Sequence, residues 1–96
     1  MGVRFEWDFK KATDNLLKHR ISFEEAMTVF NDPLAVIFED EDHSTEEARE
    51  IIIGHSIRNR LTLVCFTERK KEIVRIFSAR LVTRKERKNY EENRKF

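Results

Sequence analysis

The chain has 96 residues, of which 40% are hydrophobic and 39% are charged. This composition excludes an intrinsically disordered chain, which has too few apolar residues to form a core. No apolar run is long enough to cross a bilayer, and the first residues lack the apolar stretch of a secretory signal, so no membrane association and a cytoplasmic location are expected. The length predicts a single domain, residues 1–96, with one modest core.

The net charge of +1 conceals two halves of opposite sign. Residues 1–48 contain five Lys/Arg and twelve Asp/Glu, whereas residues 49–96 contain fourteen Lys/Arg and six Asp/Glu. A locally basic half indicates a polyanionic or acidic partner. The alternative is that the two halves neutralise each other within the fold.

The first half predicts a strand followed by two helices. Residues 3–7 alternate as a short strand does, and Asp8 is a suitable N-cap for a helix. That helix carries Phe9, Ala12, Thr13 and Leu16 on one face. Ser22 and Glu25 form a predicted capping box for a second helix, which Pro33 ends.

The second half predicts four short strands and a final helix. The strands are expected at 34–38, 49–55, 61–67 and 72–79, with an acidic loop after the first and tight turns at 56–60 and 68–71. Gly54 indicates a bulge or the start of a turn. Thr83 and Glu86 form a second predicted capping box, which starts a helix at residue 84. Because tight turns join antiparallel neighbours, the pattern predicts an α+β fold.

Positive charge gathers where the last predicted strand gives way to the last helix. Strict alternation places Val74, Ile76, Ser78 and Arg80 on one face of that strand. A helix N-terminus favours anions, and Arg80 with Arg84 adds cationic donors, so this junction is a candidate phosphate site. The alternative for the neighbouring lysines is a solvated helix face that pairs with nearby glutamates.

Two further arginines, Arg49 and Arg75, fall in predicted strands rich in apolar residues. A strand arginine in such surroundings is unfavourable unless it reaches a partner or a groove. Either it contacts a ligand, or it pairs within the chain with a carboxylate such as Glu68 or Glu72, or it protects an edge strand.

The three histidines have spacings that match no zinc signature, so no metal site is predicted. The dipole at a helix C-terminus stabilises a protonated imidazole, which is sufficient to explain His19. A nuclease that uses the ribose 2′-hydroxyl also needs groups that accept and donate protons, and His19 and His55 are candidates for these roles.

Three other features have simpler interpretations. The acidic run Glu39–Asp42 lacks the glycine and spacing of an EF-hand and is interpreted as a solvated loop. Cys65 lies within an apolar strand and is therefore interpreted as a small core or half-buried residue and not as a nucleophile. A single cysteine forms no internal disulfide. Tyr90 lies on the basic helix and is a candidate for stacking on a base.

Several segments occur together in an order that resembles the BrnT family. These segments are "FEWDFKKATDNLLKHRISFEEAMTVFNDP", "REIIIGHS", "RLTLVCFTER" and "RIFSARLVTRKERKNYEE". The resemblance implies a RelE/ParE-like toxin fold, with an antiparallel sheet of about four to five strands, two N-terminal helices and one C-terminal helix. It also implies a ribonuclease toxin that inhibits translation and is neutralised by a BrnA-like ribbon-helix-helix antitoxin. Operator DNA is then bound only through that antitoxin.

The resemblance also implies roles for individual residues in a metal-independent, cofactor-free cleavage of RNA. The implied catalytic residues are His19, Arg49, Glu68 and Arg80, and the implied RNA-binding residues are Arg75, Ser78, Arg84 and Tyr90. The sequence departs from the family pattern at Arg20, where glycine is common, and at Leu81, where a basic residue is frequent.

Two other functions are compatible with the same sequence. One is a ParE-like inhibitory toxin without catalytic activity, and the other is a simple nucleic-acid-binding module. An acid–base pair within reach of a bound phosphate distinguishes the enzyme from both.

Overall fold

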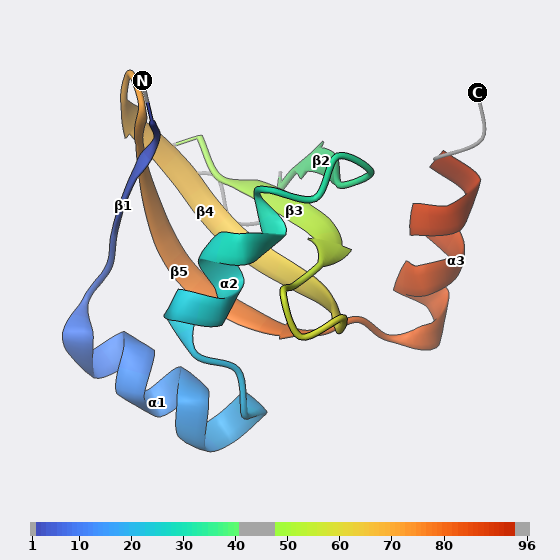
Figure 1. Ribbon diagram of the computed structural model, residues 1–96, viewed down its shortest axis with the longest axis horizontal. Helices are drawn as coiled ribbons and strands as arrows, with labels where there is room; N and C mark the ends of the chain where they lie inside the picture. The colour runs from blue at the N-terminus through green and yellow to red at the C-terminus, as the bar shows by residue number, and fades with distance from the viewer. Residues whose placement is uncertain (1, 41–47, 94–96) are drawn as a thin grey trace.

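The computed structural model describes residues 2–40 and 48–93 (Figure 1). Most of the predicted acidic loop, including Glu41, Asp42 and His43, lies outside these ranges. The described residues form five strands and three helices in an α+β arrangement, as predicted. The strands are β1 (Arg4–Glu6), β2 (Val36–Glu39), β3 (Glu50–His55), β4 (Leu61–Lys70) and β5 (Ile73–Leu81), and the helices are α1 (Phe9–His19), α2 (Phe23–Val29) and α3 (Arg84–Asn93). None of these helices is long and apolar enough to cross a membrane.

The five strands form one sheet in the order β1-β5-β4-β3-β2. Strands β2 to β5 are antiparallel neighbours, as their short connections predict. Strand β1 pairs with β5 in parallel, so the sheet is mixed and the expected purely antiparallel sheet is wrong at this edge. The turn argument fails here because β1 is joined to β5 by most of the chain and not by a hairpin.

Each face of the sheet supports its own apolar cluster. The helical face packs against α1 and α2, and its cluster includes Ile52, Val64, Phe66, Val74, Ile76 and Ala79 from the sheet with Ile21, Phe23 and Val29 from the helical layer. The opposite face, called here the α3 face, joins Ile53, Leu61 and Leu63 to Tyr90 of α3. In Figure 1, α2 lies in front of the sheet while α3 stands beyond the end of β5.

A β-bulge at Phe77 reverses the predicted facing of the end of β5. Cys65 pairs with Ser78 and the next residue, Phe66, pairs with Ile76, so Phe77 is an extra residue in β5. Ala79 therefore shares the helical face with Ile76, whereas Ser78 and Arg80 lie on the α3 face. The predicted common face for Val74, Ile76, Ser78 and Arg80 is wrong, because one inserted residue shifts the alternation.

Helix α1 starts as predicted but buries a different face. The Asp8 carboxylate accepts a hydrogen bond from the backbone N–H of Lys11 at 3.0 Å. The buried residue of the helix is Asn15, whose amide donates to Ala79 O at 2.8 Å and accepts from Ala79 N at 3.1 Å. Strand β1 pairs only with the start of β5, so Asn15 satisfies backbone groups farther along that edge. The expected apolar face is consequently turned outward, with Phe9 and Leu16 exposed.

Helix α2 has half of the predicted capping box. Ser22 Oγ accepts a hydrogen bond from Glu25 N at 2.9 Å. The Glu25 side chain does not return to Ser22; it is buried and accepts hydrogen bonds from Ser56 and Arg60 in the β3–β4 hairpin. Arg60 also donates to the carbonyl oxygen of Arg20 at 3.0 Å, so this ion pair ties the hairpin to both N-terminal helices.

Gly54 is a regular residue of β3, and neither the predicted bulge nor a turn is present there. A Cβ at this position would lie 2.8 Å from Ala35 Cβ and 3.0 Å from Asp32 Oδ2. The absence of a side chain therefore lets the segment after α2 approach β3 closely.

Candidate active site

The α3 face carries a row of side chains that we call the basic strip. It consists of Arg75, Phe77, Ser78 and Arg80 of β5, together with Arg49, which precedes β3. The bulge creates this row, since Arg75 and Arg80 would otherwise face opposite sides of the sheet. Arg49 precedes β3 and reaches across β4, where its guanidinium carbon lies 4.0 Å from the centre of the Phe77 ring. Lys11 approaches the same ring at 5.4 Å. Such cation–π contacts fix a cation over an aromatic face.

Arg80 is held by Glu86 of α3. Its Nη1 and Nη2 atoms each donate to a Glu86 carboxylate oxygen at 2.8 Å, and Nη1 also donates to Leu81 O at 3.2 Å. Glu86 accepts from Thr83 N at 2.8 Å and donates its own N–H to Thr83 Oγ1 at 3.1 Å, which confirms the predicted capping box. The Arg80 hydrogen bonds, together with Thr83, lower the pKa of Glu86 to about 2. The same pairing raises the pKa of Arg80.

The planar guanidinium of Arg80 has a second edge with two N–H donors. Of its five N–H groups, three donate to Glu86 and Leu81. The remaining two, on Nε and Nη2, lie side by side and donate to no acceptor among residues 2–40 and 48–93. This edge matches the geometry of two phosphate oxygens, so Glu86 orients Arg80 without using all of its donors.

Cys65 lies beneath the strip opposite Ser78. Burial raises the pKa of the Cys65 thiol, although a hydrogen bond with Ser78 and the positive charges of Arg80 and Arg49 act in the other direction. The thiol is therefore neutral, which agrees with its interpretation as a core residue. The charge effects also show that both guanidinium groups lie near this point of the sheet.

Arg75 forms an ion pair within the chain, but its carboxylate partner was not predicted. Arg75 Nη1 lies 3.3 Å from Glu6 Oε2, and Arg69 contacts the same carboxylate oxygen. The hydrogen bond from Arg69, followed by the Arg75 contact, lowers the pKa of Glu6. Parallel pairing of β1 with β5 puts Glu6 beside Arg75, and this pairing was invisible in the sequence.

Two of the implied catalytic residues are not brought together with Arg80. His19 ends α1, which covers the helical face, whereas the Arg80 side chain lies on the α3 face. Glu68 pairs with Val74 near the far end of the β4–β5 hairpin. Arg80 lies six positions after Val74 in β5, which corresponds to about 20 Å along a strand.

The two predicted RNA-binding residues of α3 differ in exposure. Arg84 is exposed in the first turn, close to the Arg80–Glu86 pair. Tyr90 is only 1% exposed and packs on Leu61 and Leu63. Tyr90 anchors α3 to the sheet, and its ring is not accessible for stacking on a base in this arrangement.

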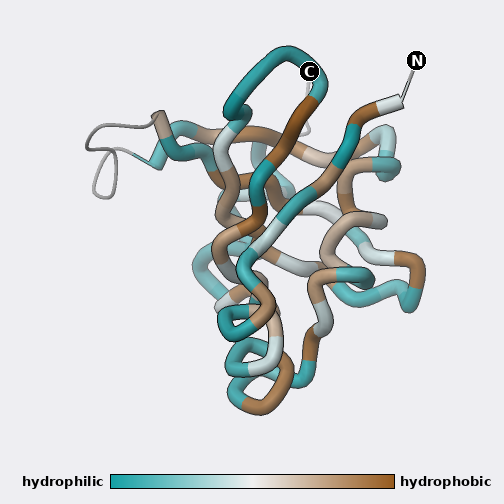
Figure 2. Tube along the Cα trace, turned by 90° about the vertical axis from the view of Figure 1, so that its left-hand side faces the viewer, coloured by the Kyte–Doolittle hydropathy of each residue, from teal (hydrophilic) through white to brown (hydrophobic). Residues whose placement is uncertain are grey.

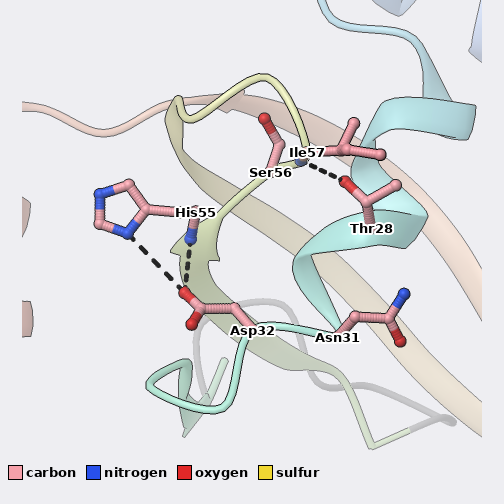
Figure 3. A pocket seen from close by; sticks show the side chains of 6 residues that line it. All are labelled: Thr28, Asn31, Asp32, His55, Ser56 and Ile57. Carbon is pink, nitrogen blue, oxygen red and sulfur yellow. Dashed lines mark hydrogen bonds and ion pairs between the residues drawn. The ribbon is translucent and has the colours of Figure 1, made fainter.

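His55 occupies a separate pocket of about 270 Å³ between the end of α2 and β3 (Figure 3). Asp32 Oδ2 accepts from His55 N at 2.7 Å and lies 3.7 Å from His55 Nδ1. The Asp32 Oδ1 atom accepts from Leu34 N at 2.9 Å. These contacts show that Asp32 chiefly closes the loop after α2, and no arginine of the basic strip lines this pocket.

Sequence reasoning missed two members of the site. Glu86 was expected to cap the helix but not to hold Arg80, although its spacing from Arg80 across a strand end was a usable signal. Phe77 was not among the candidate residues, because nothing in the sequence marks the bulge that turns it toward Arg49.

Comparison with known proteins identifies the family. A family model described as "Ribonuclease toxin, BrnT, of type II toxin-antitoxin system" matches residues 7–86. The crystal structure of the Brucella abortus ribonuclease toxin BrnT is similar, with 20% sequence identity, a TM-score of 0.66, and coverage of 85% of this chain and 99% of that chain. This likeness shows a common fold, while the RelE/ParE-like classification stays a prediction. No curated protein matches significantly. The chain belongs to the BrnT family, the ribonuclease toxins of type II toxin–antitoxin systems.

Proposed function

We propose that this ribonuclease toxin is a metal-independent endoribonuclease that cleaves RNA on the basic strip and thereby inhibits translation. The observation that carries the proposal is the arrangement of Arg80. Glu86 fixes one edge of its guanidinium, and the other edge faces away from that carboxylate on the surface that also carries Ser78 and Arg49.

The proposed reaction depends mainly on stabilisation of charge. The ribose 2′-oxygen attacks phosphorus and loses its proton, the bond to the 5′-oxygen breaks, and that oxygen takes a proton. The products are a 2′,3′-cyclic phosphate and a 5′-hydroxyl. Negative charge develops on the phosphoryl oxygens, where preorganised donors have their largest effect. Arg80 and Arg49 supply these donors, and Ser78 and Arg84 bind flanking phosphates.

The geometry favours no general base among the residues expected from the sequence. His19 and Glu68 lie away from Arg80, as described above. Glu86 is adjacent, but a carboxylate with a pKa of about 2 is a weak base at neutral pH. We therefore assign Glu86 a positioning role, and Arg75, paired with Glu6, a secondary electrostatic one.

The test compares cleavage of a fluorescent RNA in EDTA by the unaltered chain and by three variants. Arg80→Ala removes the donors, and Arg80→Lys retains the charge but removes the planar edge. Lys18→Ala is the control, because it removes one exposed positive charge from α1, which packs on the opposite side of the sheet from Arg80. Loss of one such donor group lowers turnover by about 100-fold or more, and we expect this for both Arg80 variants.

The expected pattern is EDTA-resistant cleavage that both Arg80 variants lose and Lys18→Ala retains. Circular dichroism and thermal melting verify that each variant is folded. Cleavage that stops in EDTA and returns with Mg²⁺ would refute metal independence. Full activity of Arg80→Ala would exclude the basic strip as the active site.

The toxin–antitoxin membership implies an antitoxin, and we propose that it is BrnA-like with a ribbon-helix-helix DNA-binding part. The toxin then contacts operator DNA only through this protein. A gel-shift assay with operator DNA tests this: we expect a shift with the complex and none with the toxin alone. The description of the family as ribonucleases disfavours the ParE-like non-catalytic alternative.

A further inference from the structure

Helix α1 turns apolar side chains toward solvent. Phe9 is 83% exposed, Leu17 is 74% exposed and Leu16 is 47% exposed. Phe9 and Leu16 are seven residues apart, so they lie on one side of the helix, and Leu17 flanks them. Figure 2 shows apolar and hydrophilic residues alternating along this helix, at the bottom of the view. This outward face exists because Asn15 occupies the inward face and is committed to Ala79.

The exposed side chains border a groove between α1 and the start of α2. Its apolar lining includes Trp7, Phe9, Leu16 and Phe23, and its volume is about 170 Å³. A second hollow, lined by Leu16, Leu17 and Arg20, adjoins it. Single exposed apolar residues are ordinary, whereas a contiguous set beside a groove is typical of a protein interface.

The charges around this groove have both signs. Arg20 lines the second hollow and Glu24 lines the groove, while Lys10 of α1 pairs with Asp14 at 3.3 Å. An exposed apolar stripe with a mixed polar border complements the apolar face of an amphipathic helix. RNA would leave these apolar side chains uncovered.

We propose that the α1–α2 groove binds an amphipathic helix of the antitoxin, with apolar anchors on Phe9, Leu16 and Leu17 and an acidic residue facing Arg20. The inference rests on the toxin–antitoxin membership and on the proposed function, which names the antitoxin as the partner. It adds the surface of the toxin that the antitoxin binds. The groove lies on the α1 and α2 side of the sheet, whereas the basic strip lies on the α3 side. Antitoxin binding and RNA cleavage are therefore separable by mutation.

The experiment measures the affinity of the purified antitoxin encoded beside this gene, by isothermal titration calorimetry. The test variant is Phe9→Ser with Leu17→Ser, which changes only strongly exposed side chains. The control is Ile57→Ser, because Ile57 is comparably exposed on the β3–β4 hairpin and lines neither hollow. Removal of central anchors is expected to raise Kd by about 10-fold or more, and the control is expected to leave Kd unchanged. Arg20→Glu is expected to weaken binding as well, more at low salt than at high salt.

Unchanged affinity of the double variant would overturn the inference. Sedimentation of the toxin alone provides a second criterion: if the unaltered chain self-associates and the double variant is monomeric with full antitoxin affinity, the groove joins copies of the toxin and the inference is wrong. RNA cleavage is measured on the same proteins. An inactive toxin that still binds antitoxin through this groove would refute the proposed catalytic site and leave the docking inference intact.

Discussion

The substitution Glu86→Gln tests whether the Arg80–Glu86 pair stabilises the junction between β5 and α3. A lowering of the pKa from 4.5 to about 2 corresponds to an upper bound of about 3.5 kcal/mol, at about 1.4 kcal/mol for each pKa unit. The two side chains are 38% and 27% exposed, so solvent screening reduces the expected contribution to roughly 1–2 kcal/mol. The substituted amide would retain a single acceptor oxygen and lose the charge-assisted hydrogen bonds.

The assay is urea unfolding of both proteins across a range of pH. Because the folded-state pKa of Glu86 lies below its ordinary value, the stabilisation is fully present above about pH 4.5 and is lost as the pH falls toward 2. The two proteins should therefore differ at pH 7 and converge near pH 2. Asp14→Asn is the control, since Asp14 belongs to a strongly exposed pair with Lys10, and little change is expected. Equal unfolding free energies of the unaltered chain and Glu86→Gln at pH 7 would show that the pair contributes nothing.

Three further substitutions test other features of the fold and surface. Gly54→Ala should lower the unfolding free energy by about 1–3 kcal/mol, because the new Cβ meets Ala35, and adding Ala35→Gly should recover part of the loss in urea unfolding. Arg20→Gly should raise stability by about 1 kcal/mol, since Arg20 ends α1 with a φ of 61°, and an unchanged melting temperature would argue against strain there. Glu6→Gln should release Arg69 and Arg75 from their shared carboxylate, so RNA affinity should fall more steeply with salt, and an unchanged salt slope would contradict this.

Local signals predicted most of the fold. The predicted N-caps of the three helices are Asp8, Ser22 and Thr83, and all three are confirmed. They were predictable because each side chain caps a backbone group only a few residues away. The hairpins were predicted for the same reason, because polar turns join alternating segments. Strand β4 nevertheless runs to Lys70, beyond its predicted end at residue 67, and the left-handed residue of the following turn is Glu72. Hydrophobic pattern alone does not locate the end of a strand that continues into solvent.

The features that sequence reasoning missed all depend on contacts between distant segments. Asn15 is a polar residue on the buried face of α1, and its burial is explained by its hydrogen bonds with the backbone of Ala79. The parallel pairing of β1 cannot be read from turn lengths, because no turn joins it to β5. The bulge at Phe77 has no glycine or proline to mark it, yet it decides that Arg80 faces the α3 side. The candidate site was therefore predictable as a set of residues but not as a surface.

The opposite charges of the two halves of the chain also gain a structural explanation. The alternative of internal neutralisation holds in part, because carboxylates of the first half pair with selected arginines of the second. Glu25 holds Arg60, and Glu6 contacts Arg69 and Arg75. Arg80 instead pairs with Glu86 of its own half, through one edge of its guanidinium. Internal pairing thus engages Arg60, Arg69 and Arg75, whereas Arg80 keeps the second edge of its guanidinium at the end of β5, where we place the scissile phosphate.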